Sequence, residues 1–134
     1  AVAMNPPFYP PGGSRASPVP NRKAAHVAEG ALAPWLRTAR RLLRPGGHLA
    51  LIHRVEALPE VLAGLETGFG AIAVRPIHAF ADKPAIRIIV TAILNSRKPA
   101  TLLPAFVING ADGRLTPFSD AVHRGRERLA PDYQ

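Results

Sequence analysis

The chain begins Ala1-Val2-Ala3-Met4-Asn5-Pro6-Pro7-Phe8, and this stretch predicts a buried strand that runs into a stiff turn. The first four residues are short and apolar, as the end of a buried strand is. The Asn-Pro-Pro-Phe motif that follows (residues 5–8) contains two prolines, which donate no backbone hydrogen bond and hold the chain extended. We therefore expect the motif to leave the carboxyl end of a strand.

The motif has the groups needed to hold a planar molecule that carries an exocyclic amine. The side chain of Asn5 offers a carbonyl oxygen, and the carbonyl of Pro6 is a second acceptor. Phe8 adds a flat apolar face that can cover a ring. The structural alternative is that Asn-Pro begins an ordinary turn and that Pro-Pro is a stiff connector.

Two helices are predicted from apolar residues at helical spacing. The first covers residues 30–43 and places Trp35 on its apolar face, while Arg37, Arg41 and Arg44 fall on a different stripe. A second, shorter helix begins near residue 58 and ends near residue 68. We expect the arginine stripe to face solvent or RNA.

Strands are predicted between and after these helices. An apolar run over residues 48–52 follows a Pro-Gly-Gly turn, and a strand over residues 71–80 is interrupted at Pro76. The β-branched run over residues 86–94 is apolar on both faces, which predicts a central or well-covered strand. Residues 102–108 are a candidate edge strand, and a short helix is expected from Thr116 to about residue 129.

The order strand, helix, strand, helix, strand, strand indicates a layered α/β sheet. Its last two strands can be joined antiparallel without a crossover helix. This is half of a doubly wound fold. Residues 9–25 are dense in Pro, Gly and Ser, and we interpret them as a mobile substrate loop.

Length and composition fit one domain or part of one. The chain has 134 residues, of which 47% are hydrophobic, and this argues against disorder.

No apolar run reaches the roughly 20 residues that span a bilayer, and the first residues lack the pattern of a signal peptide. We expect a soluble, cytoplasmic protein without a membrane partner. The absence of cysteine excludes disulfides and thiolate nucleophiles.

The charge balance is strongly basic. There are 17 Lys and Arg against 9 Asp and Glu, which gives a formal net charge of +8 and favours a polyanionic partner such as RNA. The alternative is a solvated basic surface. Candidate phosphate contacts are Arg15, Arg22, Lys23, Arg37 and Arg41.

The five histidines do not form a metal-binding pattern. They are dispersed along the sequence, without the HxH or HxxxH spacing that brings two ligands together. We expect no metal site and interpret them as surface or sheet-edge residues. They are His26, His48, His53, His78 and His123.

The sequence resembles the Asn-Pro-Pro-aromatic class of S-adenosylmethionine-dependent methyltransferases. The resemblance runs from the motif through the helix of Trp35, the Leu-Leu-Arg-Pro-Gly-Gly turn at residues 42–47 and the strands up to residue 94. Together with Tyr-Pro-Pro-Gly-Gly at residues 9–13 and Leu-Leu-Pro at residues 102–104, the motif looks most like the bacterial tRNA(Val) adenine-N6 methyltransferase group.

The resemblance implies the carboxyl-terminal half of a Rossmann-like, seven-stranded methyltransferase sheet with its last strands antiparallel. In this class the motif follows strand four, whereas the glycine-rich and acidic cofactor sites follow strands one and two, which have no counterpart here. Residues 1–134 are therefore expected to be the carboxyl-terminal part of one methyltransferase domain. Such a part would be inactive alone and would bind S-adenosylmethionine weakly. Its exposed sheet edge would also favour self-association.

By the same resemblance, Asn5 and Pro6 accept the two amine hydrogens, Pro7 fixes the loop and Phe8 stacks on the base. Asn5 also borders the cofactor site. The leading acceptor is adenine N6 of tRNA. Guanine N2 of ribosomal RNA and the glutamine amide of a protein remain open, because all three present a planar, conjugated nitrogen. A non-catalytic RNA-binding module is a further alternative, with Arg37, Arg40, Arg41 and Arg44 on phosphates.

Overall fold

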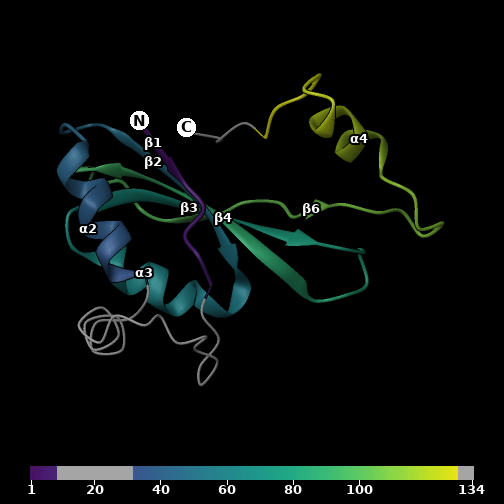
Figure 1. Ribbon diagram of the computed structural model, residues 1–134, viewed down its shortest axis with the longest axis horizontal. Helices are drawn as coiled ribbons and strands as arrows, with labels where there is room; N and C mark the ends of the chain where they lie inside the picture. Colours follow the sequence, from purple (N-terminus) through teal and green to yellow (C-terminus); the bar gives the residue numbers. More distant parts are fainter. Residues whose placement is uncertain (9–31, 130–134) are drawn as a thin grey trace, which may run out of the picture.

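A computed structural model of the chain describes residues 1–8 and 32–129 (Figure 1). The sequence-predicted loop over residues 9–25 lies outside them. The elements are β1 (Val2–Met4), α2 (Ala33–Leu42), β2 (His48–Arg54), the 3-10 helix η1 (Val55–Ala57), α3 (Leu58–Glu66), β3 (Phe69–His78), β4 (Ala85–Leu94), β5 (Thr101–Leu102), β6 (Phe106–Val107) and α4 (Pro117–His123).

The described strands form one mixed sheet in the order β1-β2-β4-β3-β5, with β6 also paired to β3. β1 and β2 are parallel, and Met4 pairs with Leu51. β4 lies between β2 and β3 and is antiparallel to both. The predicted α/β class is confirmed, as are the antiparallel last strands and the central position of the β-branched run.

The hydrophobic core lies between the sheet and the two helices α2 and α3, which cover the same face (Figure 1). Leu36 of α2, Val61 of α3 and Val90 of β4 belong to this core, and Val61 and Val90 are fully buried. The backbone N–H of Leu32 donates to the Glu60 carboxylate at 3.0 Å, which ties the start of α2 to α3. The two helices are therefore held together at the edge of the sheet where β1 and β2 end.

The position of Trp35 corrects the prediction for the first helix. Leu36 and Ala39 are buried as expected, but Trp35 is 40% exposed and Leu42 is 71% exposed. The helix runs from Ala33 to Leu42, so Arg44 lies beyond its end and does not extend the arginine stripe. The apolar stripe is narrower than the sequence suggests because only α3 and the sheet cover it.

β3 is continuous through Pro76, whereas the sequence predicted an interruption there. The carbonyls of Val74 and His78 accept bonds from Leu103 and Ile108, on the side of β3 away from β4. Pro76 is two residues from each of them along the strand, so its backbone nitrogen, which lacks a hydrogen, faces the same side. It falls between the short strands β5 and β6, where no ladder bond is needed.

The predicted edge strand over residues 102–108 is divided into β5 and β6, both parallel to β3. Pro104 lies between them, and its carbonyl accepts a 2.9 Å bond from Nη1 of Arg75. α4 begins after Thr116, whose side chain caps the N–H of Ser119 at 3.1 Å. It ends at His123, before the predicted end near residue 129.

Candidate functional site

The Asn-Pro-Pro-Phe motif directly follows β1, as the sequence predicts. Asn5 and Pro7 are exposed, Pro6 is buried and Phe8 is half-buried. Because β1 and β2 are parallel, their carboxyl ends meet at the same edge of the sheet. The motif therefore lies beside the last residues of β2.

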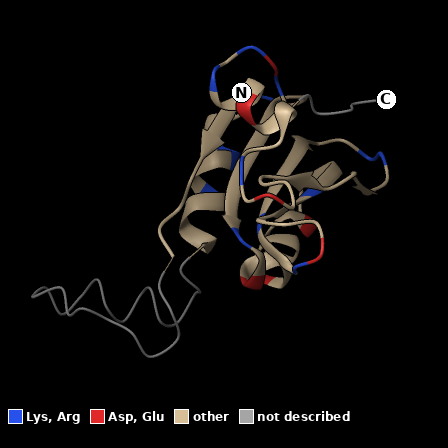
Figure 2. Cartoon of the chain, turned by 90° about the vertical axis from the view of Figure 1, so that its right-hand side faces the viewer, with Lys and Arg blue, Asp and Glu red and all other residues tan. Residues whose placement is uncertain are grey.

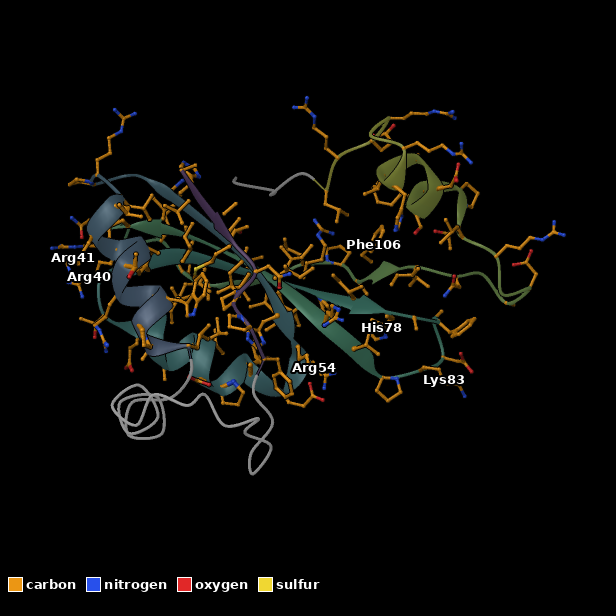
Figure 3. The ribbon with its side chains drawn as sticks, in the orientation of Figure 1. Arg40, Arg41, Arg54, His78, Lys83 and Phe106 are labelled. Carbon is orange, nitrogen blue, oxygen red and sulfur yellow. The ribbon has the colours of Figure 1, made fainter. Side chains whose placement is uncertain are left out.

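Phe8 contacts two residues at the end of β2, His53 and Arg54, and we call these three residues the Phe8 cluster. The rings of Phe8 and His53 meet edge to face, with centroids 5.9 Å apart and an interplanar angle of 70°. The guanidinium carbon of Arg54 lies over the Phe8 ring, 4.4 Å from its centroid. Figure 3 shows Arg54 at this end of the sheet, far from Arg40 and Arg41.

The backbone N–H of Arg54 determines which ring nitrogen of His53 carries the hydrogen. The N–H of Arg54 donates to Nδ1 of His53 at 2.8 Å, so Nδ1 is unprotonated and Nε2 carries the hydrogen of the neutral ring. Burial lowers the pKa of His53; attraction to Glu60 opposes this shift, and repulsion from Arg87 reinforces it. His53 is thus a neutral N–H donor near pH 7, and its Nε2 cannot accept a proton.

The sequence did not identify the β2 half of this cluster. It assigned His53 to the surface or a sheet edge, which is wrong because His53 is only 7% exposed. Leu49, Leu51 and His53 alternate along β2 toward the helices, and that period of two was the available signal. Arg54 carries no comparable signal, because its contact depends on how β1 and β2 are aligned.

The predicted RNA-contacting arginines do not gather at the motif. Arg37 and Arg41 are exposed on α2, and Arg41 lies in its last turn, close to where β2 begins and away from where it ends. Arg40 donates to the carbonyl of Thr67 at 3.4 Å. Figure 2 shows Lys and Arg spread over several parts of the described surface. Arg15, Arg22 and Lys23 lie outside the described residues.

Residues for a metal ion or a complete cofactor site are not found in the described part of the chain. No three His, Asp or Glu side chains there could share a metal ion.

The Gly46-Gly47 pair shapes the turn before β2. Gly46 has a φ of +76°, and a Cβ on Gly47 would lie 2.7 Å from the carbonyl oxygen of Arg44. Within residues 1–8 and 32–129, no helix is long and apolar enough to cross a membrane.

Of the comparisons with known proteins, the one with solved structures supports this architecture. No family model matches the sequence, and no curated protein matches it. A similar crystal structure is that of a predicted O-methyltransferase from Agrobacterium tumefaciens, with a TM-score of 0.77 and 28% sequence identity. The match covers 97% of this chain and 53% of that protein, so the chain spans about half of its length. The chain therefore has a methyltransferase-like α/β fold.

Proposed function

We propose that this chain is the acceptor-side, carboxyl-terminal part of an S-adenosylmethionine-dependent methyltransferase. The acceptor is an exocyclic amine of a base in RNA, with adenine N6 of tRNA as the first candidate. The observation that carries the proposal is the location of the Asn-Pro-Pro-Phe motif after β1, in a sheet like that of a predicted methyltransferase. Ligands of open α/β sheets bind outside the carboxyl ends of the strands, where this motif lies.

The motif residues would position the amine and activate it. The Asn5 side-chain oxygen and the Pro6 carbonyl each accept one amine hydrogen, which draws the nitrogen lone pair out of the conjugated ring. Buried Pro6 and its neighbour Pro7 keep the two acceptors at a fixed spacing. Phe8 covers the base plane, a contact worth roughly 1–3 kcal/mol by alanine substitution. Positioning supplies most of the rate enhancement.

S-adenosylmethionine, when bound, supplies the methyl group from a positively charged sulfonium. Of the described residues, only Asn5 would lie at the border of that cofactor, and the rest of its binding site would come from a part of the protein that precedes β1. We therefore expect the chain alone to bind the cofactor weakly and not to turn over. Calorimetry that detects micromolar affinity for S-adenosylmethionine would contradict this expectation.

A hydroxyl is the alternative acceptor, because the similar structure is described as a predicted O-methyltransferase. A hydroxyl has one hydrogen and would leave one of the two acceptors unpaired, whereas an amine satisfies both. A hydroxyl acceptor also commonly needs a base. The imidazole nearest the motif, His53, carries its proton on Nε2 and is unsuited to that task. The described residues thus favour an amine.

The decisive experiment replaces Asn5 in the complete enzyme. Asn5→Ala removes one amine acceptor and should abolish RNA methylation, while S-adenosylmethionine binding stays largely intact. Methyl transfer to unmodified tRNA would be measured beside cofactor affinity. Arg97→Ala is a suitable control. Arg97 is exposed and follows the carboxyl end of β4, which lies beside the start of β2, away from the motif. Near-wild-type activity of Asn5→Ala would refute the assignment.

A second experiment, in cells, would identify the acceptor base. Mass spectrometry of RNA from a deletion strain should reveal the loss of one N6-methyladenosine from tRNA. Loss of N2-methylguanosine from ribosomal RNA, or of methylglutamine from a protein, would redirect the proposal to the corresponding acceptor. RNA binding that is unaffected by Asn5→Ala, with no modification lost, would favour a non-catalytic RNA-binding module.

A further inference from the structure

We propose that Arg54 covers the Phe8 ring while the acceptor site is empty, and leaves it to bind an RNA phosphate when a base stacks on Phe8. This inference rests on the proposed RNA acceptor. It adds a residue that positions the substrate strand, on an element other than the motif. Arg54 would act as a binding residue and would take no part in the chemical step.

In the proposed complex, the Arg54 guanidinium and the substrate base compete for one face of the Phe8 ring. The Arg54 guanidinium lies 4.4 Å from the centroid of the Phe8 ring, within the usual range of a cation–π contact. A base that stacks on this face must displace it. Base stacking is the stronger interaction, and Arg54 is exposed, so the exchange is favourable and sterically open. His53 contacts the same ring and is buried, so it stays in place.

The charge around Arg54 also favours an anionic ligand. Arg54 pairs directly with Arg87 across β2 and β4, and both side chains are exposed. Like charges directly opposite each other in an antiparallel pair are destabilising. Among the described residues, no ion pair to either guanidinium is formed, although Glu56 and Glu60 lie on the next elements. An anion such as a phosphate would relieve this repulsion, and arginine binds phosphate through a planar pair of donors.

Arg54 is also placed where its side chain can reach the backbone of the bound nucleotide. Asn5 and Pro6 would hold the amine of the base, and Phe8 its plane, so the sugar and phosphate of the same nucleotide must lie outside the ring stack. Arg54 is at the end of the neighbouring strand, β2, and already extends over this ring. A small movement of its flexible side chain would take the guanidinium from the ring to the substrate backbone.

The test is the salt dependence of RNA binding by the full chain. A single-stranded oligoadenylate would be titrated against wild type, Arg54→Ala and the control Arg97→Ala at several salt concentrations. Loss of one phosphate contact reduces the slope of log affinity against log salt by about one. We expect this reduction for Arg54→Ala and no reduction for Arg97→Ala. Equal reductions in both variants, or none in Arg54→Ala, would overturn the proposal.

NMR can show directly whether Arg54 leaves the Phe8 ring when the oligonucleotide binds. In the free chain, the ring current of Phe8 should shift the Arg54 side-chain protons upfield in the NMR spectrum, and Phe8→Leu would identify these signals by abolishing the shift. Addition of oligoadenylate should return them to ordinary positions. Signals that stay shifted in the saturated complex would show that Arg54 does not leave the ring.

These outcomes separate this inference from the proposed function. A wild-type chain without salt-dependent binding to oligoadenylate would contradict both the RNA acceptor and the role of Arg54. Wild-type binding with an unchanged slope in Arg54→Ala would contradict the role of Arg54 alone. The methylation assay with Asn5→Ala would then still decide the enzymatic proposal.

Discussion

At the residue scale, His53 is the site residue with a defined acid response. Its pKa in the folded chain lies below the ordinary value of 6.5, first because of burial. The unfolded chain therefore binds this proton more readily than the folded chain does. The stability associated with neutral His53 is fully present above the ordinary pKa, and it is lost as the pH falls through the lower pKa of the folded state.

We predict that the free energy of unfolding decreases on acidification from about pH 7.5 to about pH 5, and that His53→Asn weakens this decrease. Asparagine keeps an oxygen near the position of Nδ1 and does not titrate. Urea denaturation at several pH values measures both chains. His48→Asn is the control, because His48 is exposed and lies at the other end of β2. An unaltered pH dependence in His53→Asn would contradict the assignment.

The residues of the candidate site differ in how far the sequence alone can identify them. Asn5 and Phe8 belong to a local motif, and their position after a strand could be read from four apolar residues and two prolines. Arg54 could not be identified in this way. Its contact with Phe8 joins two strands that are far apart in the sequence, and the parallel register between them leaves no trace in the order of residues.

At the element scale, the β3–β4 pair depends on the close approach of two backbones at Gly70. A Cβ on Gly70 would lie 2.3 Å from the carbonyl oxygen of Ser96. Backbone atoms cannot move aside as the end of a side chain can. We predict that Gly70→Ala lowers the free energy of unfolding by about 1–3 kcal/mol, as measured by urea denaturation.

Gly64 provides the matched comparison. In Gly64→Ala the new Cβ would lie 2.3 Å from Cδ1 of Leu36, at the flexible end of that side chain, and alanine also favours the helix α3. The loss of stability should therefore be smaller than in Gly70→Ala. A larger loss in Gly64→Ala would mean that the α2–α3 contact is less adaptable than the backbone contact.

Secondary structure was predictable here where a pattern is local. The β-branched run that became β4 is apolar on both faces, which is typical of a central strand, and β4 does lie between β2 and β3. Pro76 misled the prediction, because its missing N–H is harmless only between β5 and β6. Trp35 misled it for a related reason: helical spacing identifies an apolar stripe, but it does not reveal whether another element covers the whole of that stripe.

At the scale of the whole molecule, the side of the sheet at β1 remains open in the described part of the chain. β1 pairs only with β2 there. Beside it lies a groove of about 370 Å³ between β1 and α2, lined by Val2, Ala3, Met4, Pro34, Trp35, Thr38, Ala39 and Leu42. An unpaired strand edge next to apolar surface is a template for association. In a longer protein, this is where we expect the preceding strands and helices to pack.

We therefore predict that the isolated chain self-associates through the β1 edge and this groove. Sedimentation velocity should detect species larger than the monomer, in a proportion that grows with concentration. Trp35→Glu places a charge in the groove and should shift the equilibrium toward the monomer. Leu115→Glu is the control: Leu115 is exposed to a similar extent, at 41% against 40% for Trp35, but does not line the groove. A wild-type chain that stays monomeric at all concentrations would contradict the prediction, and equal effects of the two variants would move the interface away from β1.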